Sequence, residues 1–404
     1  MHVALSAIQP VVSTAEANAR RRCVEGVFAS TDIVFVNRNR SGKYANGRMK
    51  QNQDLARGNL RVAGLSHVHS FIVCDGHGAH GHFVSKHVVD KYDSELLLWI
   101  ESLRDDHWIM RQHGPLEKEV VEDVYNNLRA IVLRCENALY NELPEHAVLS
   151  GTTLNAVLLV GNVLFTVNVG DSRSALVTVE NNVGADELLL EGDDDLDDDV
   201  PEIIASTPLT VDHDLTGMSE MEAIRRAGGV LSRGERGGPS RVWLATDKAK
   251  SYVAHNSPSA KALAAWTCKY LRRHTEQQIE IDGGTHCGLP GLAMSRSIGD
   301  FVGKLAGVSA EPDLSHSVLT LTENAHHYIV LGSDGFYGVV DQDILDDMVI
   351  SWEHRIVSNT GRENTYTTLE KVVDEAIHSV QRTWIVTQSY SDDITALVVR
   401  ISAR

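Results

Sequence analysis

Short runs of apolar and β-branched residues alternate with longer amphipathic segments along this chain. The short runs have the length and composition of buried strands, and they cover residues 71–74, 153–160, 163–169, 328–331 and 394–401. Gly161-Asn162 separates two of these runs and supplies residue types that tolerate the positive φ of a tight turn. The pattern therefore predicts several strands, two of which form a hairpin.

Apolar residues that recur at spacings of three and four predict one long amphipathic helix. They are Leu116, Val120, Val124, Leu128, Ile131, Cys135 and Leu139. Shorter helical patterns cover residues 82–99, 220–226 and 369–387. Consecutive hairpin strands mixed with long helices favour an α+β layered sandwich over a doubly wound parallel sheet.

Length and charge narrow the class of protein. The 404 residues are enough for one large domain with insertions, and the formal net charge is −18. An acidic chain is unsuited to general nucleic-acid binding or to docking on anionic membranes, so we expect neither partner. The acidic run at 186–199 is predicted to be a solvated loop. Residues 211–290 are glycine-punctuated and weakly periodic, which predicts a surface excursion.

The five cysteines are scattered and include no Cys-x-x-Cys pair, so the sequence predicts neither a disulfide framework nor a zinc site. No basic head precedes an apolar run at the start of the chain, which argues against a secretory signal. We expect a reducing compartment, the cytoplasm or the nucleus. Arginines and small residues near the start give weak support to mitochondrial targeting.

Aspartates follow or precede the predicted strands at four places. Asp75, Asp171 and Asp334 each come just after a strand, and Asp392-Asp393 comes just before one. A single aspartate in such a position is usually a turn former. Four strand ends in one core can meet at a common rim, where clustered carboxylates repel unless a divalent cation is bound. Oxygen ligands without clustered cysteines favour Mg²⁺ or Mn²⁺ over zinc.

Asp75 opens the run Asp75-Gly76-His77-Gly78. The flanking glycines let the backbone bend sharply, which exposes the Gly76 carbonyl as a further oxygen ligand. His77 lies two residues beyond the carboxylate and is a candidate proton donor beside the metal.

Six motifs occur in order and together resemble those of the metal-dependent type 2C serine/threonine protein phosphatases. They are DGHG at 75–78, SGTT at 150–153, VGDSR at 169–173, GLAMSRSIGD at 291–300, GSDG at 332–335 and SDDIT at 391–395. GHFVSK after the first motif and NQD at 52–54 are similar to the plant and protist branches. The resemblance implies a central antiparallel β-sandwich flanked by helices on both sides. It also implies a single catalytic domain over 46–402, an N-terminal extension over 1–45, and a flap within about 211–290.

The resemblance also implies a role for each matching residue. Asp75 would bridge two Mg²⁺ or Mn²⁺ ions, and the Gly76 carbonyl would bind one of them. Asp334 and Asp392 would complete the carboxylate set, and Asp171 matches the position of a third, weaker metal. Asp54 would support the ligands, Asp300 would lie near the site, and His77 would be the general acid. A hydroxide shared by the two metals would attack phosphorus directly, without a phosphoenzyme.

Two departures from the family pattern concern residues 49 and 53. Gln53 stands where many members have glutamate, although NQD variants occur. The family's phosphate-holding basic residue would fall on Met49, and Arg48 and Lys50 flank it. Either one is a candidate clamp for the phosphate after a shift of one residue, and either is equally compatible with an exposed basic side chain.

The predicted substrates are phosphoserine and phosphothreonine proteins, and we expect a monomer. The main alternative is an inactive type 2C-like pseudophosphatase that serves as a binding or regulatory module. Loss of a metal carboxylate would indicate that alternative, yet Asp75, Asp334 and Asp392 are all present.

Overall fold

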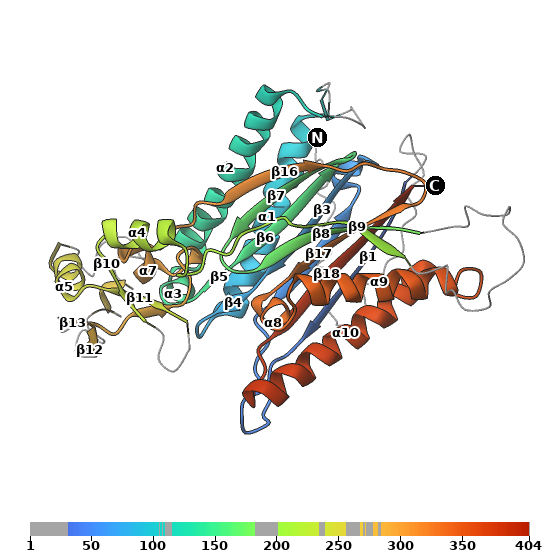
Figure 1. Ribbon diagram of the computed structural model, residues 1–404. Helices are drawn as coiled ribbons and strands as arrows, with labels where there is room; N and C mark the ends of the chain where they lie inside the picture. Colours follow the sequence, from blue (N-terminus) through green and yellow to red (C-terminus); the bar gives the residue numbers. More distant parts are fainter. Residues whose placement is uncertain are drawn as a thin grey trace, which may run out of the picture.

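A computed structural model describes residues 31–104, 106, 108–109, 115–181, 201–233, 239–255, 267–269, 271, 278–281 and 284–403. Two antiparallel sheets lie face to face at its centre (Figure 1). The first sheet has the order β1 (Thr31–Arg40), β18 (Ile394–Ala403), β17 (Ala325–Gly332), β8 (Arg173–Glu180) and β9 (Glu202–Pro208). The second has the order β16 (Asp313–Val318), β7 (Val163–Val169), β6 (Leu154–Val160), β3 (Val68–Cys74) and β2 (Leu55–Leu60).

Helices cover the outer face of each sheet (Figure 1). On the second sheet lie α1 (Gly81–Ser102) and α2 (Lys118–Glu142), and on the first lie α9 (Gln342–Ser358) and α10 (Thr365–Gln388). The cap residues fit the helix starts, because Asp341 accepts a hydrogen bond from the Ile344 N–H and Asn364 accepts one from the Thr367 N–H. The prediction of an α+β antiparallel sandwich flanked by helices on both sides is confirmed.

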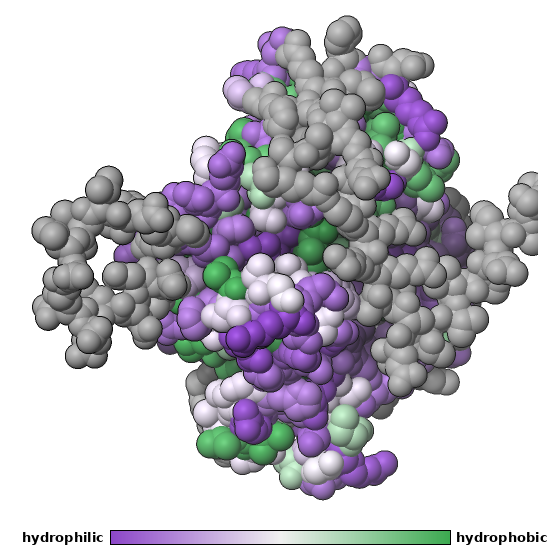
Figure 2. Space-filling model, turned by 90° about the vertical axis from the view of Figure 1, so that its right-hand side faces the viewer, coloured by the Kyte–Doolittle hydropathy of each residue, from purple (hydrophilic) through white to green (hydrophobic). Residues whose placement is uncertain are grey.

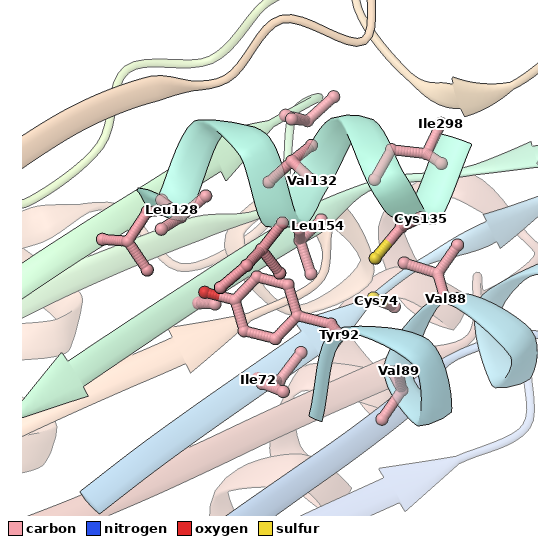
Figure 3. Close-up of a cluster of buried hydrophobic side chains, with 14 of the residues drawn as sticks. Ile72, Cys74, Val88, Val89, Tyr92, Leu128, Val132, Cys135, Leu154 and Ile298 are labelled. Carbon is pink, nitrogen blue, oxygen red and sulfur yellow. The ribbon is translucent and has the colours of Figure 1, made fainter. Parts of the chain in front are cut away.

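Three hydrophobic layers hold these elements together. One lies between the two sheets, one under α1 and α2, and one under α9 and α10. Figure 3 shows the second of these, where Val88 and Tyr92 of α1, Val132 and Cys135 of α2, and Ile72 of β3 gather in one cluster. Each such side chain contributes roughly 1.5–3 kcal/mol when fully buried. On the face that Figure 2 presents, the described surface is mostly hydrophilic, with hydrophobic residues in small separate groups.

Smaller elements extend one end of the sandwich. Three two-residue strands, β4 (Gly76–His77), β5 (Gly151–Thr152) and β15 (Ile298–Gly299), form a small sheet beside the strand ends. Short helical segments are η1 (Val62–Gly64), α3 (Pro144–Ala147), α7 (Phe301–Leu305) and α8 (Asp334–Tyr337). Among the described helices, none has the length and apolar character needed to cross a membrane.

The predicted excursion contains its own elements at one end of the molecule (Figure 1). They are α4 (Met218–Arg226), β10 (Gly229–Ser232), β11 (Arg241–Leu244), α5 (Thr246–His255), β12 (Gln278–Ile281) and β13 (Gly284–Cys287), with β14 (Pro290–Leu292) completing the sheet of β10 and β11. The acidic run at 186–199 lies outside the described residues.

The N-terminal extension predicted over 1–45 needs correction. Residues Thr31–Arg40 form β1, which pairs antiparallel with β18 from Thr31 opposite Ala403 to Arg40 opposite Ile394. The strand was missed because its second half is polar, so it lacks the apolar run of a buried strand. Residues 1–30 lie outside the described residues.

A buried ion pair links α9 to the first sheet. The Glu353 carboxylate accepts hydrogen bonds from Arg400 Nε and Nη2, both at 2.7 Å, and from the Tyr328 hydroxyl at 2.6 Å. Burial raises the pKa of Glu353, but the hydrogen bonds and charge of Arg400 outweigh burial and lower it to about 2. Because the folded pKa lies below the ordinary value of 4.5, this pair stabilises the fold above pH 4.5 and loses that effect as the pH falls toward 2.

We therefore expect Glu353→Gln to reduce the free energy of unfolding at pH 7 by about 3–5 kcal/mol, because it leaves the Arg400 charge buried without a partner. The difference between variant and wild type should shrink between pH 4.5 and pH 2. Urea unfolding followed by circular dichroism across this pH range measures both effects. Glu375→Gln is the matched control, since Glu375 pairs with Arg355 at the surface and its loss should change little. A pH-independent difference would contradict the assignment.

Candidate metal centre

Strand register brings the predicted aspartates to one rim of the sandwich. In the second sheet, Val73 pairs with Asn155 and Leu154 pairs with Val169, so the ends of β3 and β7 lie level. Asp75 follows β3 directly. In the first sheet, Gly332 at the end of β17 pairs with both Ala396 and Arg173.

The remaining three aspartates enter the same rim from the connections around these strands. Asp171 lies where the chain crosses from β7 in one sheet to β8 in the other. Asp334 begins α8 just after β17, and Asp392 lies two residues before β18. The rim is therefore built from both sheets, and all four aspartates lie along it.

The carboxylates influence one another strongly. Burial, followed by the charges of Asp54, Asp334, Asp171 and Asp392, raises the pKa of Asp75 well above its ordinary value. Burial and then the charge of Asp334 raise the pKa of Asp171 to about 7. The pKa of Asp334 is also raised, first by burial and then by Asp392. Ionised together without a counter-charge, these groups would be costly to bury.

Asp54 belongs to the same cluster. Burial and the charge of Asp393 raise its pKa to about 7, and the nearby hydroxyls of Thr395 and Ser333 offset part of the shift. Both carboxylate oxygens of Asp54, and Oδ1 of Asp171, are buried without a hydrogen-bond partner among the described residues. Unpaired buried oxygens of this kind are rare in proteins, and they supply the hard donors that Mg²⁺ and Mn²⁺ prefer.

The donor set fits such a cation in chemistry. Within the described part of the chain, however, no three His, Cys, Asp or Glu side chains are grouped closely enough to hold a metal ion by themselves. Gly76 is enclosed by backbone, since a Cβ there would lie 2.6 Å from the Gly81 carbonyl oxygen and 2.7 Å from that of Gln53. Glycine is thus required next to Asp75 for the chain to pass through the rim.

The SGTT motif fixes the backbone of Asp75. The Asp75 N–H donates to Thr153 Oγ1 at 2.9 Å, and the Asp75 carbonyl accepts from the Thr153 N–H at 2.9 Å and the Thr152 hydroxyl at 3.0 Å. Thr153 Oγ1 also lies 2.7 Å from Ser172 Oγ, next to Asp171. This motif therefore ties the Asp75 and Asp171 turns together, a role that its sequence alone did not reveal.

The structure separates the roles of the adjacent Asp392 and Asp393. Asp393 accepts hydrogen bonds from the Gly42 N–H at 2.6 Å and the Gln53 N–H at 2.9 Å, so both of its oxygens hold the segment between those residues. The Asp392 side chain is 43% exposed and ion-pairs with Lys50 Nζ at 2.8 Å. Asp392 faces the rim, whereas Asp393 tethers a loop.

Of the two candidate basic residues, the structure brings Lys50 to the cluster. Lys50 bonds Asp392 and lies 5.5 Å from the centre of the Tyr390 ring. Burial lowers the pKa of Lys50, but the hydrogen bond and charge of Asp392 outweigh burial and raise it. Arg48 is exposed, and its backbone bonds with Asn46 and Tyr44 hold a surface turn.

His77 has a partner that the sequence did not identify. His77 Nε2 lies 2.6 Å from Asp300 Oδ2, which also accepts a 2.7 Å hydrogen bond from the Ser297 hydroxyl. Burial lowers the pKa of His77, but the charge and hydrogen bond of Asp300 outweigh burial and raise it. His77 Nδ1 is buried and has no partner among the described residues. Asp300 holds one ring nitrogen and leaves the other available.

Glycine is also required at the position that faces this pair. A Cβ at Gly151 would lie 2.1 Å from Asp300 Oδ2 and 2.8 Å from His77 Nε2. The Gly299 N–H donates to Glu136 Oε2 at 2.7 Å, which fixes the turn that carries Asp300. The family resemblance placed Asp300 near the site, but the separation of 223 residues from His77 explains why the sequence could not pair the two side chains.

An antiparallel sandwich with a rim of carboxylates and an adjoining histidine–aspartate pair has the chemical groups that metal-dependent hydrolysis uses. Residues 46–380 match the family model for protein phosphatase 2C. The chain therefore belongs to this family of metal-dependent serine/threonine protein phosphatases.

Curated relatives and solved structures agree with this assignment. The chain is 26% identical over 370 residues to probable protein phosphatase 2C 35 of Arabidopsis thaliana, covering 92% of this chain and 84% of the relative. It is 29% identical over 299 residues to probable protein phosphatase 2C 1 of the same plant, covering 69% of this chain but only 50% of the relative. The serine-threonine phosphatase 2C structure from Toxoplasma gondii shares the fold, with a TM-score of 0.59, 16% identity, and coverage of 92% and 95% of the two chains.

The assignment of Asp393 as a tether can be tested by Asp393→Asn. An amide has one acceptor oxygen, so either the Gly42 or the Gln53 N–H loses its partner, and we expect a loss of about 1–3 kcal/mol in the free energy of unfolding. Urea titration with intrinsic fluorescence measures this loss. Asp374→Asn, which removes an exposed partner of Arg38, is the control and should change stability much less. Equal stability of Asp393→Asn and wild type would refute the tether.

Proposed function

We propose that this chain hydrolyses phosphoserine and phosphothreonine in proteins, with Mg²⁺ or Mn²⁺ held at the carboxylate rim. The observation that carries the proposal is the convergence of carboxylates with raised pKa values at the ends of strands from both sheets. Asp75, Asp334 and Asp392 hold two ions together with the Gly76 carbonyl, and Asp171 holds a third, weaker one. Asp54 supports this set from the buried side.

When bound, the cations lower the pKa of water and neutralise charge on the phosphate oxygens. The chain's own residues perform the remaining tasks. Lys50 binds a phosphate oxygen, since it lies beside Asp392 and its pKa is raised. Arg48 reaches solvent, and we assign it no contact with the phosphate.

His77 donates a proton to the leaving serine or threonine oxygen through Nδ1. Asp300 holds Nε2, so we assign the donor role to Nδ1, which has no hydrogen-bond partner among the described residues. Asp300 also favours the protonated imidazole that such a donor requires. General-acid catalysis of this kind contributes about 10²–10⁴-fold to the rate.

Hydrolysis of p-nitrophenyl phosphate by metal-stripped protein, titrated with Mn²⁺ and then Mg²⁺, tests the proposal. We expect turnover that requires metal and that EDTA abolishes. Asp334→Asn should abolish turnover but leave the circular dichroism spectrum unchanged, because the removed charge holds metal rather than the core. Asp346→Asn is the control, since Asp346 bonds Ser206 outside the rim and its loss should leave turnover intact.

The same titration decides between an enzyme and the pseudophosphatase alternative. A folded wild-type protein without turnover at millimolar metal would refute the phosphatase and favour a binding or regulatory module. Full activity of Asp334→Asn at saturating metal would instead refute the assignment of the metal ligands.

The general-acid role of His77 predicts a dependence on the leaving group. His77→Ala should slow hydrolysis of a phosphoserine peptide by about 10²–10⁴-fold, because an alkoxide needs a proton on departure. Hydrolysis of p-nitrophenyl phosphate should fall much less, because p-nitrophenolate is a good leaving group. Steady-state rates of the variant on both substrates measure this contrast. Equal losses on the two substrates would remove His77 from the role of proton donor.

A further inference from the structure

His213 is buried against the turn that carries Asp171, although it lies in the segment leading to the excursion. The Gly170 N–H donates to His213 Nδ1 at 3.0 Å, and the His213 N–H donates to the Gly170 carbonyl at 3.0 Å. Gly170 has a φ of +103°, and a Cβ there would lie 2.6 Å from the Thr153 side chain. His213 therefore fixes both polar groups of a strained turn directly before Asp171.

The other ring nitrogen of His213 joins a chain of charged side chains. Nδ1 accepts a hydrogen bond, so in the neutral ring the proton is on Nε2. Nε2 lies 3.0 Å from Asp313 Oδ2, within ion-pair distance, but its geometry there does not make a hydrogen bond. Asp313 Oδ1 accepts from Arg296 Nη1 at 2.7 Å, and Arg296 Nη2 donates to Glu220 Oε1 at 2.7 Å. Glu220 lies in the first turn of α4. A continuous set of contacts thus runs from α4 to Gly170.

Most of the side chains in this set of contacts are shielded from solvent. The side chains of His213, Arg296 and Glu220 are 3%, 18% and 15% exposed, whereas Asp313 is 57% exposed. Ser295 also holds the backbone of His213, because the Ser295 N–H and hydroxyl both donate to the His213 carbonyl, at 2.8 and 3.0 Å. Directional contacts between partly buried charges hold their partners in one geometry, whereas exposed ion pairs do so only weakly.

We propose that His213 is a positioning residue for Asp171, and that the contacts through Asp313 and Arg296 to Glu220 couple the placement of α4 to it. The inference rests on the proposed function, because it takes Asp171 as a ligand of the weaker metal ion. Groups that orient a metal ligand typically change metal affinity by about 10- to 100-fold when removed. The excursion would then set the affinity of the Asp171 position without touching the metal.

The experiment measures Mn²⁺ binding directly by isothermal titration calorimetry on the full chain, together with the Mn²⁺ concentration for half-maximal hydrolysis of p-nitrophenyl phosphate. His213→Ala should weaken the weakest Mn²⁺-binding step by about 10- to 100-fold. His213→Asn should retain most of the affinity, because its amide oxygen can replace Nδ1 as acceptor for the Gly170 N–H. The KM for p-nitrophenyl phosphate at saturating Mn²⁺ should not change.

A matched pair of variants in α4 tests the far end of the chain. Glu220→Gln should weaken the same binding step in the same direction, though less than His213→Ala. Glu222→Gln removes a neighbouring carboxylate that pairs with Arg226 at the helix surface, so it should leave Mn²⁺ affinity at the wild-type value. If Glu220→Gln and Glu222→Gln behave alike, the coupling of α4 to Asp171 is refuted.

A double-mutant cycle shows whether His213 acts through Asp171. The effect of His213→Ala on Mn²⁺ affinity should disappear in the Asp171→Asn background. Additive effects, or equal affinities of His213→Ala and His213→Asn, would overturn the positioning role. If His213→Ala does not fold, the same cycle is run with Glu220→Gln.

These experiments distinguish failure of the proposed function from failure of the positioning role. A non-additive cycle in a protein without turnover would refute the phosphatase and support the positioning role. Turnover together with an additive cycle would support the phosphatase and refute the positioning role.

Discussion

Repulsion among carboxylates gathered at one rim of the sandwich is the constraint on which the rest of the structure depends. Asp75, Asp171 and Asp334 all have raised pKa values because burial and neighbouring charges both disfavour ionisation. A fold that only minimised free energy in the absence of cations would not gather such groups. Three hydrophobic layers, none of which depends on the rim, supply the stability that tolerates this arrangement.

The aspartates at the rim are held in place mainly through hydrogen bonds to their backbone. Thr153 binds both backbone polar groups of Asp75 and contacts Ser172 next to Asp171. Asp393 uses its own charge to hold the loop that carries Lys50. Glycines at the close approaches leave no room for a Cβ. Together these contacts place the carboxylates by their main chain, and they leave Asp171 Oδ1 without a hydrogen-bond partner among the described residues.

Sequence patterns revealed most of the strands that are buried on both faces, although they missed the inner strand β8, and they missed the strands at the sheet edges. The inner strands β3, β6, β7, β17 and β18 are almost wholly buried and read as apolar runs, so they were predicted. The edge strands β2, β9 and β16, mostly exposed or half-buried, gave no such signal. The aspartates at the strand ends could be predicted because the apolar strands beside them were predicted. The sequence did not predict that His77 pairs with Asp300 or that His213 pairs with Gly170, because both are tertiary contacts between distant segments.

The excursion is joined to the core in two physically different ways. Ile224 and Leu215 pack into the hydrophobic layer beneath α1 and α2, a contact that is non-directional and tolerates small shifts. The contacts from Glu220 through Arg296 to Asp313 are directional hydrogen bonds, and Asp313 lies 3.0 Å from His213, which bonds the turn before Asp171. The apolar contact attaches the excursion to the core, whereas the polar contacts connect α4 to that turn. If His213 positions Asp171 as proposed, a change in the excursion that preserves its apolar contacts would still alter the placement of Asp171 through these polar contacts.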